Sequence, residues 1–332
     1  MLLAVLYCFA VPNKYSVLTC FQRFCCWIDI LNPFYVFTSK KKIDNARMLL
    51  LDARKNNTDS LQDEKMKKAW MLSVASVNPI SGEIMPAIFR PPAFTLCTFP
   101  LVITSTLMNR NVLHTFLSQT AFHAYVNGFG LENGNCRIRT NEAGTEDVKK
   151  LFVQNIFPVF VAVTYSSLMG TLPHFFINRY KPQRPSVQFL FRNLIPGPLT
   201  ATVCALSLCV VRNREAEEGI QVMDSKGNVV GVSKKAGEKA VNETALSRAA
   251  LFGTVLFVPD LTLHFLKRRS ILLQNPFSFT LIRWATIVVV LATMIPVSFS
   301  WMPQLNKIKR NELEPEIVSS TEESELFYYR GI

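Results

Sequence analysis

The chain has 332 residues, of which 49% are hydrophobic and 18% are charged. This balance is unusual for a soluble globular domain and typical of a membrane protein with several spans. The net charge of +12 does not indicate a nucleic-acid partner, because the basic residues lie in clusters at the ends of apolar segments. Such clusters favour anionic lipid head groups.

Residues 1–90 are expected to form soluble or interfacial helices that precede the membrane bundle. Apolar positions repeat at helical spacing in Ile43–Leu51 and again in Lys65–Val74, which predicts surface helices in both stretches. Met1–Val11 is apolar but has no basic start, so it makes a poor secretory signal. Targeting information is therefore expected inside the chain.

A transmembrane bundle is expected over residues 91–306, because a helix needs roughly 20 apolar residues to cross the hydrocarbon core. Four stretches of suitable length contain no Asp, Glu, Lys or Arg, namely 91–109, 151–178, 193–211 and 284–306. A fifth segment, 249–266, contains Asp260. The acid costs roughly 2.5–3.5 kcal/mol at mid-bilayer, and the large apolar residues around it return roughly 3–6 kcal/mol. About five spans are predicted, and the uncharged segment 111–131 leaves a sixth open.

Segment 111–131 is also rich in His, Asn, Gln, Ser and Thr, which predicts an amphipathic or re-entrant helix. Gln119, His123 and Asn127 are spaced four residues apart, so on a helix they project from one face. Such a face could hydrogen-bond the amino or carboxylate group of a substrate. The alternative is an interfacial helix whose polar face meets water.

Asp260 is a second candidate for substrate binding. Acids inside membrane spans normally face a cavity or a partner, because exposure to lipid is costly. A role in binding, proton coupling or docking is one interpretation of Asp260. The other is a structural one, in which the acid pairs with an arginine or lies near the interface because the span is short.

Residues 213–247, between spans three and four, are expected to form a loop with a small β-hairpin. Ile220–Met223 and Val229–Val232 are β-prone runs around Asp224–Asn228, whose residues tolerate positive φ. Residues 307–332 are expected to be a carboxy-terminal tail. The predicted fold class is therefore an all-α multi-pass membrane protein with a soluble helical amino-terminal region and this hairpin.

The sequence does not indicate an enzyme. The eight cysteines form no CxxC pair, and the four histidines are scattered without an HExxH pattern. Phosphate-binding glycine loops and a nucleophile elbow are absent as well. No catalytic residue, metal or cofactor is therefore predicted, with an iron–sulfur ligand set kept as a minor alternative.

Several separated motifs lie in a characteristic order along the chain. Asn32-Pro33 precedes Ile43-Asp-Asn-Ala-Arg47, and the block Asn78-Pro-Ile-Ser-Gly-Glu83 follows; further on come Phe299–Gln304 and a closing Arg-Gly-Ile332. The motif positions singled out are Asn78, Pro79, Gly82, Glu83, Arg212, Gly219, Asp224, Gly227 and Asn228. Together they resemble the signature blocks of the sideroflexin family.

This resemblance implies a multi-pass protein of the inner mitochondrial membrane, in a family of amino-acid transporters whose best understood members move serine. Its implied partners are inner-membrane lipids and a small amino acid. The resemblance also implies a second possibility. The short interval Trp70–Asn78 and the ending Thr321–Ile332 point to a branch linked with complex I assembly, iron–sulfur metabolism and iron homeostasis.

The chain departs from the family pattern at polar positions. Asn78 and Ile80 replace the His and Asp of the family block His-Pro-Asp-Thr-Gly-Glu, while Cys204 and Ser207 stand where relatives carry Asn. If the replaced groups bind serine in the family, as the resemblance implies, this chain is expected to carry a different substrate. The alternative is a non-transporting assembly factor that supports respiratory complex I. Met1–Leu18 does not match the family pattern.

Overall fold

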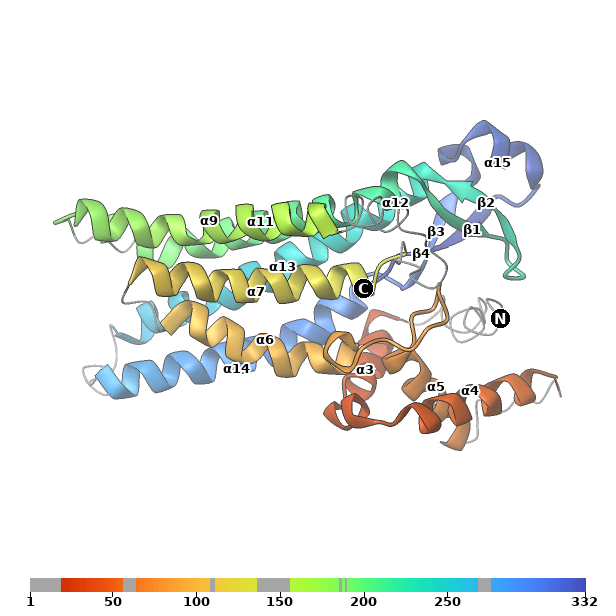
Figure 1. Ribbon diagram of the computed structural model, residues 1–332, viewed down its shortest axis with the longest axis horizontal. Helices are drawn as coiled ribbons and strands as arrows, with labels where there is room; N and C mark the ends of the chain where they lie inside the picture. The colour runs from red at the N-terminus through yellow and green to blue at the C-terminus, as the bar shows by residue number, and fades with distance from the viewer. Residues whose placement is uncertain are drawn as a thin grey trace, which may run out of the picture.

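A bundle of helices that lie side by side sets the long axis of the molecule (Figure 1). The computed structural model describes residues 19–55, 64–107, 111–135, 156–184, 187–188, 190–267 and 276–332. The bundle helices are α6 (Pro91–Leu107), α7 (Val112–Glu132), α9 (Phe157–Tyr180), α11 (Pro196–Val211), α13 (Lys234–Lys267) and α14 (Pro276–Ser300). Each of them contacts the next and α14 contacts α6, so the helices close into a ring.

Within the described residues, three helices are long and apolar enough to cross a membrane, namely α9, α13 and α14. The helices α6 and α11 are shorter, with 17 and 16 residues. These five helices overlap the five expected spans, although residues 108–109 of the first span and 151–155 of the second lie outside the described part of the chain. The count of about five spans stays a prediction.

The last span differs from the expected segment 284–306. Its helix, α14, begins at Pro276 and ends at Ser300. The start is earlier because Arg283 lies inside the helix, where it pairs with Asp260. The end is earlier because Leu305–Lys309 forms a strand.

The uncharged segment 111–131 forms α7, a continuous helix of 21 residues in the bundle. It contacts α6, α9 and α11. Gly130 lies against α11, where an added Cβ would be 2.7 Å from Leu208 Cδ1. The segment is therefore packed between other helices, which differs from the expected amphipathic or re-entrant helix.

The expected loop 213–247 is largely helical, which corrects the prediction. The short helix α12 spans Asn213–Glu217, and α13 begins already at Lys234. At that point the Glu314 carboxylate accepts hydrogen bonds from the backbone N–H groups of Lys234 and Lys235. With 34 residues, α13 is about 51 Å long, which exceeds a hydrocarbon core of about 30 Å. Its first turns therefore lie beyond the membrane core.

The strands β1 (Ile220–Met223) and β2 (Val229–Ser233) pair antiparallel around the expected turn. The Asp224 carboxylate accepts hydrogen bonds from the backbone N–H groups of Lys226 and Asn228. Gly227 has a φ of 83°, a conformation that glycine adopts without steric cost. These contacts hold the turn in shape.

The carboxy-terminal segment is folded, so the expected tail is corrected. It contains β3 (Leu305–Lys309) and β4 (Glu325–Tyr329), which join the hairpin in a four-stranded sheet of order β2-β1-β4-β3. Between them lie η7 (Arg310–Glu312) and α15 (Pro315–Ser320). Tyr328 is fully buried and its hydroxyl donates a 3.0 Å hydrogen bond to the Glu243 carboxylate of α13. The fold is therefore mostly helical with a small sheet rather than all-α.

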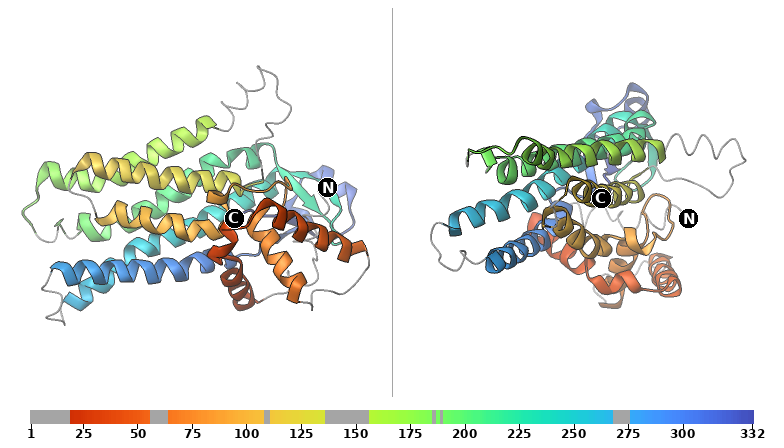
Figure 2. Two further views of the ribbon diagram at one scale, coloured as in Figure 1. Left: turned by 60° about the horizontal axis from the view of Figure 1, so that its bottom comes forward. Right: turned by 60° about the vertical axis from the view of Figure 1, so that its left-hand side comes forward.

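The amino-terminal helices pack at the sheet side of the bundle (Figures 1 and 2). Their bounds are α3 (Cys20–Ile30), η1 (Pro33–Phe37), α4 (Lys40–Lys55), α5 (Glu64–Ser76) and η3 (Ala87–Phe89). The expected helical stretches 43–51 and 65–74 lie within α4 and α5. Residues 1–18, which include the apolar start, lie outside the described part of the chain.

Candidate functional site

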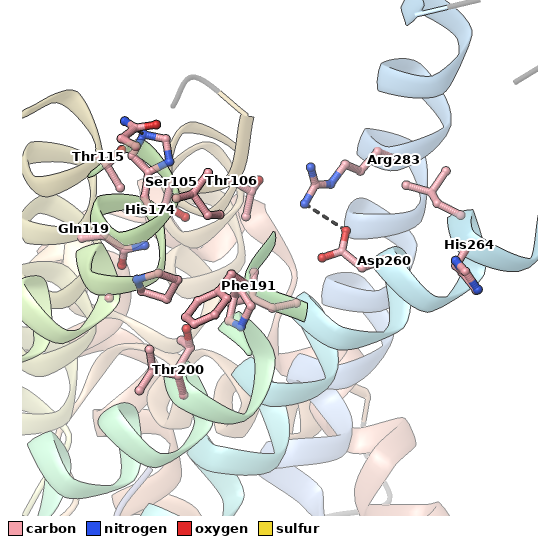
Figure 3. Close-up of a pocket in the computed structure, with 18 of the residues that line it drawn as sticks. Ser105, Thr106, Thr115, Gln119, His174, Phe191, Thr200, Asp260, His264 and Arg283 are labelled. Carbon is pink, nitrogen blue, oxygen red and sulfur yellow. Dashed lines mark hydrogen bonds and ion pairs between the residues drawn. The ribbon is translucent and has the colours of Figure 1, made fainter. Parts of the chain in front are cut away.

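A cavity of about 790 Å³ lies between the bundle helices (Figure 3). It is lined by residues near those ends of α6, α9 and α13 that lie away from the sheet (Figure 1). Every bundle helix contributes to its wall, together with Phe191 of the short π-helical turn η5 (Leu190–Leu194). The polar side chains of the wall are Ser105, Thr106, Thr115, Gln119, His174, Asn178, Thr200, Asp260, His264 and Arg283. A cavity of this size is typical of sites for small molecules.

The wall contains an ion pair between two neighbouring helices. Arg283 Nη2 of α14 lies 2.9 Å from Asp260 Oδ1 of α13, and these side chains are 22% and 9% exposed. Figure 3 shows the pair on one side of the cavity, with Gln119, Thr115 and His174 on the other. An ion pair inside an apolar bundle costs desolvation energy, so its position in a cavity wall favours a functional role. The arginine partner expected for Asp260 is therefore present, and the pair also borders a cavity.

Gln119 is the outermost residue of the expected polar face on α7, and it lines the cavity. Opposite it lies Gly170 of α9, where an added Cβ would be 2.9 Å from Gln119 Oε1. The absence of a side chain at Gly170 therefore gives Gln119 its room.

His123 and Asn127 lie one and two turns deeper along α7. They are 1% and 0% exposed, so neither faces water as the interfacial alternative requires. Among the described residues, neither ring nitrogen of His123 nor either polar atom of the Asn127 amide has a hydrogen-bond partner. Buried polar groups of this kind are nearly always hydrogen-bonded, so each of them calls for an explanation.

Ser166 of α9 is a third buried polar group, and it lies beside the polar face of α7. Since Gly170 lies opposite Gln119 and the two helices run antiparallel, Ser166 lies one turn behind the cavity at the depth of His123. Its hydroxyl oxygen is buried and likewise has no hydrogen-bond partner in the described part of the chain. We refer to His123, Asn127 and Ser166 as the inner polar face.

Thr200 of α11 lines the cavity, and Cys204 and Ser207 follow it along the helix. Both are about 1% exposed. The Ser207 hydroxyl donates to the backbone oxygen of Cys204 at 3.1 Å, so its proton is used within the helix. These two positions therefore offer less hydrogen-bonding capacity than the asparagines of the family pattern.

The family block at residues 78–83 lies far from the cavity and forms a turn. The Asn78 amide nitrogen donates to the backbone oxygens of Glu132 and Gly134 at the end of α7, and its side-chain oxygen accepts from Ile80 N and Ser81 N. Pro79 follows Asn78 in this turn, and Gly82 has a φ of 68°. Glu83 is exposed and lies four residues before η3. Asn78 thus connects the turn to the sheet-side end of α7.

The motif residues of the hairpin region also lie at the sheet side. Arg212 forms a bidentate ion pair with Glu215, at 2.6 Å for both nitrogens, and both side chains are about 2% exposed or less. Gly219 has a φ of 86°, and a Cβ there would be 2.9 Å from the Ser233 backbone carbon. Gly219 therefore lets β1 begin close to β2, and Asp224, Gly227 and Asn228 shape the turn.

Arg248 of α13 marks the closed end of the bundle. Its guanidinium lies 4.7 Å from the ring centroid of Phe94, 5.2 Å from that of Phe129 and 5.0 Å from that of Phe299. The side chain is 1% exposed. Cation–π contacts of this kind stabilise a desolvated arginine, so this end of the bundle is filled with side chains.

Sequence reasoning misses Arg283, Gly170 and Arg248. Arg283 precedes the expected span 284–306 by one residue, so it falls outside every uncharged segment. The sequence signal that could have found Arg283 is its positive charge, which is opposite to that of Asp260 and lies at the edge of the next apolar segment. Gly170 and Arg248 carry no such signal, because their importance depends on residues far away in the sequence.

Within the described residues, no group of three or more His, Cys, Asp or Glu could hold a metal ion. The cysteines of that part are free thiols. The geometry instead brings hydrogen-bonding groups and one ion pair to a cavity, which is suited to reversible binding of a small polar molecule.

The apolar helices, three of which among the described residues are long enough to cross a membrane, define a multi-pass helical membrane protein. The family model described as sideroflexins matches residues 11–332, and the chain belongs to the sideroflexin family.

Curated relatives agree with the branch that the departures in the sequence indicate. Sideroflexin-4 of Mus musculus is 35% identical over 94% of this chain and 95% of its own length. Sideroflexin-4 of Danio rerio is 37% identical, with coverage of 92% and 93%. Sideroflexin-5 of Homo sapiens is 25% identical, with coverage of 94% and 89%. No solved structure matches the chain.

Proposed function

We propose that this protein is a carrier of the inner mitochondrial membrane that moves a small amino acid other than serine. The observation that supports this proposal most is the Asp260–Arg283 ion pair in the wall of a polar cavity inside an apolar bundle. The resemblance to amino-acid transporters supplies the substrate class and the membrane.

The ion pair suits a zwitterion. An amino acid carries an ammonium group and a carboxylate, and these groups are complementary to Asp260 and Arg283 respectively. The bound substrate would exchange the internal pair for two charge-assisted hydrogen bonds of similar strength. Gln119, on the other side of the cavity, offers both a donor and an acceptor to the same ligand.

A substrate other than serine is supported by α11. Serine needs partners for its hydroxyl group as well as for its charged groups, and the two amides of the family pattern are absent here. Cys204 is a weak donor and Ser207 donates to the backbone. The loss of the two amides therefore favours a substrate whose side chain needs fewer hydrogen bonds in this part of the bundle.

The test is uptake by the purified full-length protein in liposomes, with a panel of labelled small amino acids. We expect saturable uptake of at least one of them and little uptake of serine. Asp260→Asn and Arg283→Gln are each expected to lower that uptake about tenfold or more, because each leaves one substrate charge without its partner. Glu218→Gln is the matched control, since it removes a carboxylate from an exposed ion pair on the sheet side. Absence of saturable uptake for every small amino acid would overturn the proposal.

A second function is favoured by the replaced amides at Cys204 and Ser207. The protein would then be a non-transporting assembly factor that supports respiratory complex I and iron–sulfur homeostasis. Cells that lack the protein would lose complex I, and both the wild type and Asp260→Asn would restore it. Intact complex I and normal iron–sulfur enzyme activity in those cells would contradict this alternative.

A further inference from the structure

Outside the bundle helices, two strongly exposed aromatic side chains lie within the five residues of η1. Phe34 is 79% exposed and Phe37 is 82% exposed, and Phe21 of the preceding helix α3 is 73% exposed. Scattered apolar residues on a protein surface need no explanation, but large aromatic rings gathered in one short segment indicate an interaction surface. The position of η1 along the bundle determines which partner it meets.

The turn η1 is fixed to the start of α6 by Arg90. The buried guanidinium of Arg90 donates through Nη1 to the backbone oxygens of Tyr35, Val36 and Thr38, and through Nε to that of Met85. Arg90 directly precedes the first residue of α6. An apolar bundle helix has its ends near the lipid head groups, so η1 lies at head-group depth.

A second anchor gives the same depth independently. Arg23 of α3 donates through Nε to the backbone oxygen of Ser300 and through Nη2 to that of Trp301. These residues stand at the end of α14, and Trp27 of α3 packs against Phe299 there at 5.1 Å between ring centroids. Both anchors therefore hold the segment of α3 and η1 beside the sheet-side edge of the bundle, as Figure 1 shows for α3.

The charge next to these rings is positive. Lys40, Lys41 and Lys42 begin α4, which is separated from the end of η1 by two residues, and all three are exposed. Residues 19–55 contain seven Lys and Arg against three Asp, a net charge of +4. Basic residues at head-group depth attract anionic phospholipids, and aromatic rings are favoured at the same depth.

We propose that Phe34, Phe37 and Lys40–Lys42 form a membrane-binding foot. The two rings insert among the lipid head groups, and the three lysines bind the phosphate groups of anionic phospholipids. This foot fixes the depth of the sheet-side end of the bundle in the membrane. It does not depend on whether the cavity transports a substrate.

The test uses the full-length protein with the photoreactive residue benzoylphenylalanine at position 34 or 37. The protein is placed in phosphatidylcholine vesicles that contain phosphatidylglycerol as the anionic lipid, and adducts are identified by mass spectrometry. Position 232 is the matched control, because Val232 is an apolar residue of β2 that is 57% exposed but lies on the sheet. We expect lipid adducts about fivefold or more above those at position 232.

The lysines are tested in the same protein. Phosphatidylglycerol is expected to be enriched among the adducts at position 34, relative to its share of the vesicle. The variant Lys40→Gln/Lys41→Gln/Lys42→Gln is expected to remove that enrichment, whereas Lys309→Gln on β3 leaves it unchanged. Unfolding temperatures in detergent show whether each variant is folded.

Two results would overturn the proposal of a membrane-binding foot. One is a yield of lipid adducts at positions 34 and 37 no higher than at position 232. The other is a predominance of protein adducts, which would identify the surface as a protein interface instead. An unchanged lipid ratio in the triple lysine variant would contradict the proposed role of Lys40–Lys42.

Discussion

The two ends of the bundle are built from the same helices but hold their polar groups differently. At the sheet side, Arg212 pairs with Glu215 and Arg248 is enclosed by aromatic rings. At the other end, the Asp260–Arg283 pair borders a cavity. Buried polar atoms without a hydrogen-bond partner among the described residues occur on both sides, in the inner polar face and at Arg248. The difference is one of access: the ion pair of the sheet side is enclosed in the fold, while the ion pair of the other end borders space in which a ligand can bind.

The largest effect is expected at the sheet side, from Glu215→Ala. This change removes the carboxylate of a buried ion pair and also the acceptor of two hydrogen bonds from Asn135. A buried pair that loses one partner costs about 3–5 kcal/mol of stability, so the unfolding temperature in detergent should fall sharply.

The control for Glu215→Ala is Glu218→Ala, which breaks an exposed pair three residues away. Such a pair contributes about 1 kcal/mol or less. Equal losses of stability in the two variants would remove the contrast between the two ends.

The next effect is expected at the cavity, from Gly170→Leu. An added side chain there meets Gln119, so it fills part of the cavity. Uptake in liposomes should fall about tenfold or more, while overpacking costs about 1–3 kcal/mol of stability.

Gly128→Ala is the matched control for Gly170→Leu, because its Cβ would meet Phe89 rather than a residue of the cavity wall. Unchanged uptake by a folded Gly170→Leu protein would show that the cavity is not the substrate path.

A smaller effect, this time an increase in stability, is expected from Asn127→Leu in the inner polar face. The amide is fully buried without a hydrogen-bond partner in the described residues. A leucine of similar size removes the desolvation penalty, which is about 1–3 kcal/mol. The unfolding temperature should rise and uptake should fall. A lower unfolding temperature with normal uptake would place Asn127 among the residues that only stabilise the fold.

The smallest effect is expected from Glu314→Gln at the start of α13. Burial by itself raises the pKa of the Glu314 carboxyl, but hydrogen bonds from the Ser233 hydroxyl and from the backbone N–H groups of Lys235 and Lys234 lower the pKa below its usual value. A lowered pKa in the folded state stabilises the fold at neutral pH, and this contribution is lost as the pH falls through the folded-state pKa.

The variant should therefore be less stable than the wild type by about 1 kcal/mol at neutral pH. The two proteins should converge in acid, once the pH lies below the lowered folded-state pKa of Glu314. Chemical denaturation across this range measures the difference, and a gap that is independent of pH would contradict the assignment.

Much of the helical part could be predicted from the sequence. Uncharged runs indicate where an apolar helix is stable, and the β-prone residues around Asp224 indicate a hairpin. Predictions failed where partners come from distant parts of the chain. The strand Glu325–Tyr329 exists because it pairs with both β1 and β3, and the early start of α13 depends on Glu314.

The candidate site shows the same limit. Gln119, His123, Asn127 and Asp260 were expected from spacing and charge alone. Their surroundings could not be predicted, because a sequence pattern specifies the face of a helix but not the helix that covers it. Only packing shows that Gln119 borders the cavity while His123 and Asn127 lie behind it.

The sequence by itself determined the apolar character of the bundle, the hairpin turn and the family to which the chain belongs. These properties depend on local composition and on motifs read in order. The tertiary structure alone decided that the carboxy-terminal segment completes a sheet, that Asp260 pairs with Arg283 at a cavity, and that Arg248 is enclosed by three rings. Each of these depends on contacts between residues far apart in the chain, which local propensity does not encode.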